Sequence, residues 1–524
     1  DGLLGLALDP NFADNKYLYL FYSPPGNTPK QHVSRFTMDG TSLAQGSEKV
    51  LLEIPVQREQ CCHSAGSLEF GADGLLYIAV GDNTNPQASD GYAPSDARPG
   101  RAPWDAQKSS ANTHDLRGKI LRIRPTAEGG YNIPDGNLFP ADGSKGRPEI
   151  YVMGCRNPYR IAIDEKNDVV YWGDVGPDAG KDSTGLGPMG YDEINQAKGP
   201  GFFGWPYFIG NNQAYHKRDF AKNVALKAYD QKKPLNTSPN NTGAEVLPEA
   251  QPAFIWYPYG ASEEFPIVGD GGRNAMAGGV YHFANYPATN KRLPEYYDKK
   301  LYVYAWKRGW IMAVTMTDDQ KIERIERFMP STRFSNPVDF TFGPDGDIYM
   351  LEYGTVWFSQ NPDARLVHIE YIAGNRKPVA KMEASTQVGG LPLSVQFTGD
   401  QSRDFDGDDL QFEWFFTDDK VQSTEKNPSF TFDKPGTYKV RLRVSDTEGK
   451  SAESQLSIMA GNDLPQVAWE LEGNRTFFFK DRPLKYNVKV KDTEDGELLK
   501  GIQPDAVAIS MDYLSQGKDV NEIA

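Results

Sequence analysis

The sequence predicts an all-β protein whose larger part is a β-propeller, and two observations carry that prediction. One unit recurs along the first two thirds of the chain: an apolar strand, a turn rich in Asp, Asn or Gly, and a second strand containing an aromatic residue. The composition, with 12% aromatic residues, 51 Gly and 37 Pro, favours short strands joined by turns. Antiparallel hairpins that close into a ring protect their own edges, as blades of a propeller do. Two tandem β-sandwiches are the alternative from pattern alone.

The hairpin unit occurs at irregular intervals, which suits blades that carry long insertions. It covers residues 5–22, 66–82, 160–176 and 338–354, and a weaker copy runs over 280–316 with its second strand at 301–306. Loops rich in Gly, Pro, Asn and Asp separate the hairpins at 83–114, 177–201 and 211–273. Loops of this length in a compact domain usually form lids or binding walls. Residue 1 opens on a strand-like apolar run without a start methionine, so we expect a first blade trimmed at its N-terminus.

The composition changes after a Gly- and Pro-containing linker at residues 373–378. Residues 379–459 alternate apolar and polar side chains at period two over the length of a small β-sandwich. A further strand-rich segment follows over 461–524, with strands expected at 476–479 and 486–491, and we interpret it as a second sandwich, whole or incomplete. The expected domains are therefore residues 1–373, 374–460 and 461–524.

Charge and hydropathy exclude two classes of partner. The net charge of -15 disfavours nucleic acid and anionic membrane surfaces, because phosphate binding needs a basic surface. No window of about eighteen apolar residues exists, so no membrane span is expected. A neutral or sugar-like ligand fits this balance better.

The candidate centre of the protein is the hairpin over residues 66–82. His63 stands just before its first strand and Asp82 just after its second. If the two strands pair through the turn at 72–74, both side chains lie at one edge of the sheet. Asp82 can then accept from one ring nitrogen of His63 and leave the other as a base. A purely structural histidine is the competing interpretation.

Three cysteines, Cys61, Cys62 and Cys155, allow at most one disulfide. A soft-metal site for zinc or copper is one hypothesis, although neighbouring cysteines cannot easily both bind one ion. A disulfide that involves Cys155 and ties two blades together is the favoured hypothesis for an oxidising compartment.

Further polar residues stand at equivalent positions of other hairpins. Arg156 and Asn157 precede the strand that begins near residue 158, and they suit an anionic or carbonyl-rich ligand. A turn that merely caps the blade is the alternative. Lys307 and Arg308 follow the strand at 301–306, where two adjacent cations favour a carboxylated ligand, or an exposed hairpin tip. The Gly204, Trp205 and Pro206 turn could offer carbonyl oxygens to a hard cation.

Together these residues resemble a family, the soluble quinoprotein sugar dehydrogenases. The resemblance covers residues 1–371 and rests on an ordered set of motifs: the apolar run at 3–8 with Asp9 and Pro10, His63, Gly81 with Asp82, residues 156–158, 173–176, 204–206 and 307–309. Members of that family are six-bladed propellers that hold pyrroloquinoline quinone (PQQ) and calcium. The resemblance therefore implies six blades, both cofactors, and oxidation of a sugar or oligosaccharide.

The same resemblance implies roles for individual residues. His63 would take the proton of the sugar's anomeric hydroxyl, Asp82 would orient His63, and Arg156 would polarise a quinone oxygen. Asn157, Lys307 and Arg308 would bind the cofactor, with Trp256 as a candidate for stacking on it. Carbonyls of Gly204, Trp205 and Pro206 would bind calcium.

This chain departs from the family pattern in two places. Cys62 stands where an acidic residue often precedes the family's histidine. The Arg-x-Arg cofactor clamp is absent, since the chain reads Asn336, Pro337, Val338 and Asp339 there, with Arg333 the nearest arginine.

Residues 374–460 resemble the polycystic-kidney-disease (PKD) repeat. The resemblance rests on three segments in order, at 404–410, 412–416 and 435–438. Such modules resemble spacers and contact units on exported bacterial enzymes, which implies an extracytoplasmic location: periplasm, cell surface or secreted. The acidic run at 404–410 could bind calcium, or be a solvated turn.

Two other functions remain open at this point. The propeller could be a non-catalytic module that binds carbohydrate or protein, since the arginine clamp is missing. It could also be a calcium-dependent lactonase or other hydrolase that uses His63 as a base for water. Related bacterial chains with this propeller and PKD arrangement can continue into a c-type cytochrome, and this resemblance implies such a cytochrome as the electron acceptor. No Cys-x-x-Cys-His occurs in this sequence, so that domain would lie beyond Ala524.

Overall fold

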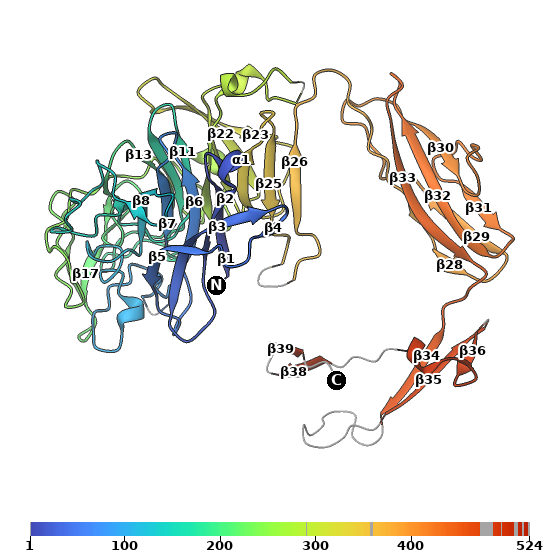
Figure 1. Cartoon of the computed structure of the whole chain (residues 1–524), viewed down its shortest axis with the longest axis horizontal. Helices are drawn as coiled ribbons and strands as arrows, with labels where there is room; N and C mark the ends of the chain where they lie inside the picture. Colours follow the sequence, from blue (N-terminus) through green and yellow to red (C-terminus); the bar gives the residue numbers. More distant parts are fainter. Residues whose placement is uncertain are drawn as a thin grey trace. The chain divides into compact units, whose positions relative to one another are not determined.

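The computed structural model describes residues 2–87, 89–289, 291–356, 360–471, 486–493, 495–507, 512–515 and 518–521. The chain divides into two compact units, Asp1–Tyr371 and Ile372–Ala524. Strands dominate both units, so the all-β prediction is confirmed (Figure 1). Within the described ranges, no helix is long and apolar enough to cross a membrane.

In its described residues, the first unit contains five larger, mainly antiparallel sheets that follow one another in chain order, and four of them have four or more strands. Sheet 1 holds β1 (Leu3–Leu8), β2 (Tyr17–Tyr22), β3 (Lys30–Asp39), β4 (Ser42–Leu43) and β5 (Lys49–Pro55), with α1 (Phe12–Asn15) between β1 and β2. Sheet 2 holds β6 (Ala65–Phe70), β7 (Leu76–Val80), β8 (Lys119–Pro125), β9 (Tyr131–Asn132), β10 (Ile150–Met153) and β14 (Gly201–Phe202), the last parallel to β10.

Sheet 3 holds β11 (Pro158–Asp164), β12 (Val169–Asp174), β13 (Asp192–Ala197) and β19 (Ile255–Tyr257). Sheet 4 holds β20 (Ala275–Val280), β21 (Leu301–Ala305), β22 (Trp310–Met316) and β23 (Ile322–Phe328). Sheet 5 holds β24 (Pro337–Phe342), β25 (Ile348–Glu352) and β26 (Arg365–Ile369). Short elements fill the loops: β15 (Phe208–Ile209), β16 (Gln213–Ala214), β17 (His216–Asp219), β18 (Val224–Ala228), and the 3₁₀ turns η1 (Ala102–Trp104), η2 (Pro266–Val268), η3 (Phe283–Asn285) and η4 (Glu295–Tyr297).

The predicted hairpins form the first two strands of these sheets. The pairs β1–β2, β6–β7, β11–β12 and β24–β25 all match the predicted repeats. The weaker repeat was misplaced at its start: its first strand, β20, ends at Val280, where the prediction began. The apolar run Ala275 to Ala277 already belongs to the strand, but its two glycines, Gly278 and Gly279, hide the pattern.

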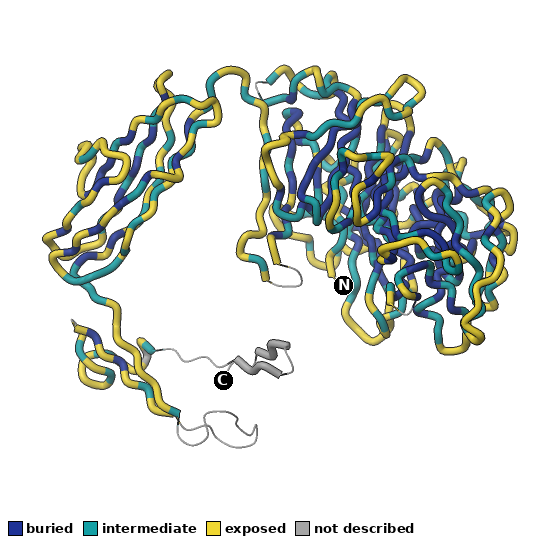
Figure 2. The backbone as a smooth tube through the Cα atoms, turned by 180° about the vertical axis from the view of Figure 1, so that it is seen from behind, coloured by how far each residue is buried: buried dark blue, intermediate teal, exposed yellow. Residues whose placement is uncertain are grey.

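The sheets follow one another like blades, because the first strand of each lies against the first strand of the next. This holds for β1 and β6, β6 and β11, β11 and β20, and β20 and β24. Buried apolar side chains fill the spaces between the sheets. In Figure 2, the buried residues of the first unit gather in its interior, and exposed residues follow its outer loops. The propeller-like architecture agrees with the prediction, whereas the count of six blades stays a prediction.

One end of the sheets gathers the candidate residues. In an antiparallel hairpin, the residues before the first strand and after the second lie at the same end. We call this end of the first unit the rim. It carries His63 before β6, Asp82 after β7, Arg156 before β11, Lys307 after β21 and Arg333 before β24.

The second unit begins with a two-sheet sandwich. One sheet holds β27 (Glu383–Ala384), β29 (Leu393–Thr398) and β31 (Ser429–Phe432); the other holds β28 (Val388–Gly389), β30 (Gln411–Phe415), β32 (Gly436–Ser445) and β33 (Ser451–Ala460). Their inward-facing side chains form one core around the fully buried Trp414. The period-two alternation read from the sequence places these side chains inward.

A four-stranded sheet follows the sandwich: β34 (Gln466–Leu471), β35 (Tyr486–Asp492), β36 (Gly496–Leu498) and β37 (Gly501–Ile502). The 3₁₀ turn η5 (Pro504–Ala506) and a separate two-stranded hairpin of β38 (Asp512–Ser515) and β39 (Lys518–Asn521) come after it in the chain. The strand predicted at 476–479 lies outside the described residues, and the second sandwich stays a prediction.

Candidate functional site

The hairpin β6–β7 brings His63 and Asp82 together. The Nδ1 atom of His63 lies 2.8 Å from Oδ1 of Asp82, and both side chains are buried. Gly74, at φ 73°, closes the turn between the strands. At the other end, Gly81 lets the backbones meet, since a Cβ there would stand 2.0 Å from the carbonyl oxygen of His63. The local sequence therefore sets this contact through one turn and one glycine.

Asp82 is held by donors from three parts of the chain. Its Oδ1 also accepts the backbone N–H of Thr84 at 2.9 Å, and its Oδ2 accepts the indole Nε1–H of Trp205 at 2.8 Å. Burial raises the pKa of Asp82, but its bonds to His63 and Thr84 and the charge of Arg156 outweigh this and lower the pKa overall. An ionised carboxylate can only accept hydrogen bonds, so Nδ1 of His63 carries the proton and Nε2 is the nitrogen able to accept one.

Arg156 and Asn157 are fixed in front of β11 by Asp174 at the end of β12. The two carboxylate oxygens of Asp174 accept the backbone N–H groups of Arg156 at 2.9 Å and Asn157 at 2.6 Å. The carbonyl oxygen of Arg156 in turn accepts the N–H of Asp82 at 2.8 Å. This backbone hydrogen bond joins sheets 2 and 3 next to the His63–Asp82 pair.

The side chains of Arg156 and Asn157 make different contacts. The Asn157 amide oxygen accepts the N–H of Ala65 at 3.0 Å, which fixes the entry of β6. The Arg156 guanidinium donates to the carbonyl of Val175 at 2.7 Å and lies 5.7 Å from the Trp205 ring. Burial, and then the charge of Arg156, lower the pKa of His63.

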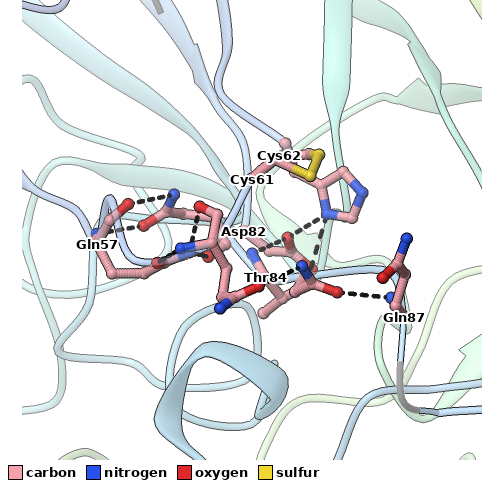
Figure 3. The surroundings of a disulfide bond; sticks show 10 residues. Gln57, Cys61, Cys62, Asp82, Thr84 and Gln87 are labelled. Carbon is pink, nitrogen blue, oxygen red and sulfur yellow. Dashed lines mark hydrogen bonds and ion pairs between the residues drawn. A yellow bond between two sulfur atoms is a disulfide. The ribbon is translucent and has the colours of Figure 1, made fainter. Parts of the chain in front are cut away.

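Cys61 and Cys62 form a disulfide directly before His63, and Cys155 is free and buried. The hypotheses of a disulfide through Cys155 and of a soft-metal site on the three cysteines are therefore wrong. The two adjacent cysteines satisfy each other, and Cys155 is packed in the core between sheets 2 and 3. Figure 3 shows the disulfide next to Asp82 and Thr84.

Amide side chains hold the disulfide segment against the strand exit. Gln57 donates its backbone N–H to the Asn83 side chain at 2.6 Å and its Nε2–H to the Asn83 carbonyl at 3.0 Å (Figure 3). Asn85 donates to the side chain of Gln60 at 3.0 Å. Like the His63–Asp82 contact, these bonds join the segment before β6 to the segment after β7.

In the turn at Gly204, Trp205 and Pro206, the Gly204 carbonyl is engaged in backbone hydrogen bonds, and calcium at this turn stays a prediction. The carbonyl of Gly204 already accepts the N–H groups of Tyr207 at 2.8 Å and Phe208 at 3.0 Å. A carbonyl oxygen has two lone pairs, so Gly204 is a poor calcium ligand in this turn. The indole of Trp205 reaches the site through its hydrogen bond to Asp82.

The remaining predicted residues separate into two places. Lys307 lies with Arg308 in a cavity on the rim, with its Nζ 4.4 Å from the Trp306 ring. Trp256 lies in β19 and packs edge-on against Phe265 in a different hollow. Its neighbour in the strand, Tyr257, points to the opposite face, which is buried. The structure therefore does not bring Trp256 to the group around Lys307.

The guanidinium group of Arg308 is engaged mainly in hydrogen bonds to backbone carbonyl oxygens. Its guanidinium donates to the carbonyl oxygens of Pro258 at 2.5 Å, Gly269 at 2.8 Å and Gly272 at 3.0 Å. The group also lies 4.6 Å from the ring of Tyr257. These contacts tie the 258–272 loop to sheet 4.

Sequence reasoning missed three contributors to the site. Thr84 and the Trp205 indole fix Asp82, and the negative charge of Asp178 acts on His63. Thr84 follows Asp82 by two residues, a spacing that could have signalled an Asx-type turn. The Trp205 contact spans 123 residues and leaves no local signal.

A separate acidic group lies in the second unit. Carboxylate oxygens of Asp404, Asp408 and Asp446 come within 4.8 Å of one another, the one such set of metal-ligand type in the described part of the chain. Asp446 is buried and accepts the amide of Asn375 at 3.0 Å. Calcium at this group stays a prediction.

Comparison with known proteins adds two family matches. Residues 1–240 match the glucose/sorbosone dehydrogenase family, and residues 375–460 match the PKD domain. Over 239 residues, the chain is 26% identical to quinoprotein glucose dehydrogenase B of Acinetobacter calcoaceticus, covering 43% of this chain and 45% of that protein. Over 356 residues, it is 26% identical to aldose sugar dehydrogenase YliI of Escherichia coli, covering 67% of this chain and 74% of that one.

A solved structure, the PQQ-bound form of an aldose sugar dehydrogenase from Streptomyces coelicolor, is also similar. It is 17% identical, with a TM-score of 0.43, and the match covers 70% of this chain and 79% of that chain. The chain thus spans less than half of one curated relative and about three quarters of the other.

Proposed function

We propose that this protein is a PQQ-dependent sugar dehydrogenase. Residues 1–240 match the glucose/sorbosone dehydrogenase family, and residues 375–460 match the PKD domain. The substrate is a sugar or oligosaccharide with a free anomeric hydroxyl. The observation that carries the proposal is the buried His63–Asp82 pair at 2.8 Å on the rim.

The pair provides the base that sugar oxidation needs. Asp82 fixes the proton on Nδ1, and Nε2 accepts the proton of the anomeric hydroxyl as the C1–H bond loses its two electrons. Burial, and then the charge of Arg156, lower the pKa of His63 and so favour the neutral imidazole, which is able to accept a proton. Product release as a lactone leaves the proton on His63, from which it passes to solvent.

The residues present fit an anionic quinone better than they fit calcium. PQQ carries three carboxylates, and the rim offers the cations Arg156 and Lys307 as well as the Asn157 backbone. When bound, PQQ would supply the two-electron acceptor for the sugar's C1 hydrogen. The Gly204 carbonyl is already engaged, so no step is assigned to calcium at that turn.

Reconstitution tests this function directly. The full chain is incubated with PQQ, with and without calcium, and a panel of aldoses is offered with a dye acceptor. We expect dye reduction that requires both PQQ and sugar. Dye reduction at the no-PQQ level for every aldose, despite tight PQQ binding, would contradict the proposal. Turnover that needs no quinone would indicate a lactonase or other hydrolase instead.

The pH dependence follows from the state of His63. Burial, then the charge of Arg156, lower its pKa below the ordinary 6.5, although Asp82 opposes the shift. Only neutral His63 can act as the base, so kcat/KM falls as the pH drops through this lowered value. We expect the acid limb of the kcat/KM profile below pH 6.5. An acid limb above pH 7 would contradict this assignment.

A binding module is the second candidate, and one observation favours it. Cys62, which replaces an acid in the family pattern, is locked in a disulfide next to His63 and cannot contribute a carboxylate. Tight glycan binding without turnover, unaffected by His63→Ala, would support this candidate.

The dehydrogenase proposal includes a partner and a location. A c-type cytochrome would accept the electrons. An extracytoplasmic location is supported by the Cys61–Cys62 disulfide, because such bonds persist in oxidising compartments.

A further inference from the structure

A hollow of about 440 Å³ opens at the outer edge of sheet 3. Three aromatic residues line it: Trp256 of β19, Phe254 just before that strand, and Phe265 in the loop after it. Residues 320–322, where the β22–β23 turn meets β23, close the other side. This turn lies at the end of sheet 4 opposite the rim, because the β21–β22 turn is on the rim. The hollow is therefore a different place from the His63 site.

The indole of Trp256 is held by two neighbours. Its ring centroid lies 5.0 Å from that of Phe265, and the two ring planes meet at 85°, so the rings form a corner. The backbone of Gly210 also packs against the indole, since a Cβ there would stand 3.1 Å from Cδ1 of Trp256. Gly210 is itself fixed, because its N–H donates to Glu193 at 2.6 Å. Trp256 remains half-buried, which leaves part of the indole open to the hollow.

The apolar wall of the hollow is anchored in the core. Phe254, Phe265 and Ile322 pack against the buried cluster between sheets 3 and 4. Phe254 also meets the Tyr171 ring edge-on, with the centroids 6.2 Å apart. The wall is thus formed before any ligand arrives, so binding does not have to order it.

Gln196 provides a fixed hydrogen-bond acceptor in the same hollow. Its Nε2 donates to the Tyr171 hydroxyl at 2.9 Å and to the carbonyl oxygen of Gln320 at 3.0 Å, which uses both amide hydrogens. The Oε1 atom is then the group that Gln196 offers to a ligand, and it can only accept. Glu264 adds an ionised carboxylate to the lining, which also only accepts. These groups suit a ligand that donates hydrogen bonds from hydroxyls.

The charges of the hollow disfavour an anionic ligand. Lys321, the one cation among the described residues that line it, pairs with Asp319 at 2.6 Å. Glu264 is exposed, and its carboxylate leaves the hollow weakly negative. A neutral sugar ring matches this arrangement, because its C–H groups pack on the negative face of an aromatic ring while its hydroxyls donate at the edge.

We propose that this hollow binds one unit of a neutral oligosaccharide or polysaccharide, as a second carbohydrate site away from the rim. The sugar ring lies in the corner between Trp256 and Phe265, and its hydroxyls donate to Gln196 and Glu264. The volume, about 440 Å³, is within the range of small-molecule sites. Such a site keeps a long carbohydrate attached to the propeller without occupying His63. Binding here does not depend on the proposed dehydrogenase reaction.

Fluorine NMR of the full chain, labelled with 5-fluorotryptophan, reads this site directly. The chain has 9 Trp, and the resonance that disappears in Trp256→Phe belongs to Trp256. Cellotriose and maltotriose are the neutral probes, and trigalacturonate is the charged one. We expect at least one neutral trisaccharide to shift the Trp256 resonance, with a Kd on the order of 1 mM. Trigalacturonate should leave the resonance in place, because Glu264 repels it.

Three variants show which side chains hold the sugar. Gln196→Leu should weaken the titration seen at Trp256 about tenfold, because it removes the fixed acceptor. Glu264→Lys should allow trigalacturonate to bind, because it reverses the charge at the edge of the hollow. Trp469→Ala is the matched control: Trp469 is an exposed tryptophan of β34 in the second unit, and its loss should leave the titration at Trp256 unchanged.

Several results would overturn the proposal. A Trp256 resonance that neither neutral trisaccharide moves at any soluble concentration would do so, as would equal shifts by neutral and charged sugars. A shift confined to the Trp469 resonance would place the carbohydrate site in the second unit. A Trp256 resonance that changes with protein concentration in the absence of sugar would assign the hollow to a second copy of the chain. Sugar binding at Trp256 in a chain that oxidises no aldose would uphold the hollow and reject the dehydrogenase.

Discussion

Replacing His63 with alanine should lower PQQ-dependent sugar oxidation by about 10³-fold, the central size for loss of a general base. The ring Nε2 is the acceptor for the anomeric proton. A water molecule that fills the space left by the ring is a much weaker base than imidazole and cannot replace it. The KM should change little, because His63 acts on the proton more than on binding. Steady-state rates with a dye acceptor, with thermal unfolding of the variant as a folding check, measure the effect.

The chain supplies a matched control for this substitution. His368 lies 2.6 Å from Asp347, a histidine–carboxylate pair like His63–Asp82, but Asp347 belongs to the β24–β25 turn at the end of sheet 5 opposite the rim. His368→Ala should leave the rate unchanged. A loss of rate equal in both variants would show that His63 is structural.

Asp82→Asn should lower the rate by about 10²-fold, and it should do so by changing the tautomer of His63. Asp82 accepts from three donors: His63, the Thr84 N–H and the Trp205 indole. An asparagine has one acceptor oxygen, so its amide must face either the indole or the imidazole. If it faces the imidazole, Nδ1 becomes the acceptor and the proton moves to Nε2, where it blocks the base.

The measurement for Asp82→Asn separates positioning from folding. Loss of the carboxylate should move the acid limb of kcat/KM to still lower pH, because Asp82 raises the pKa of His63. The buried unmatched donor should also cost about 1–3 kcal/mol of stability. Trp205→Phe, which removes one donor and keeps the charge, should lower the rate by only about tenfold. A pH profile identical to wild type in Asp82→Asn would refute the coupling.

Local sequence determined the parts of the site that lie within one hairpin. The alternation of apolar residues in 66–82 and the glycine turn predicted that His63 and Asp82 share an edge, and the 2.8 Å contact follows from that register. Hairpin geometry is local, so pattern is enough to derive it.

Contacts between distant segments could not be derived in this way. Lys307 and Arg308 both line the cavity on the rim, but Arg308 is also committed to loop carbonyls, and that commitment depends on the path of residues 258–272. Trp256 and Tyr257 fall on opposite faces of β19, and the sequence alone does not say which face meets the rim. The bond between Cys61 and Cys62 left Cys155 unpaired because neighbouring thiols were closer partners than any distant one.

That bond makes Cys155 the single thiol of a chain with three cysteines. It is fully buried between sheets 2 and 3, one residue before Arg156, so a thiol reagent can reach it only when those sheets part. The labelling rate of Cys155 in the native protein therefore reports how often the two sheets separate at the site. Ligands that bridge the two sheets should lower this rate, and ligands bound elsewhere should leave it unchanged.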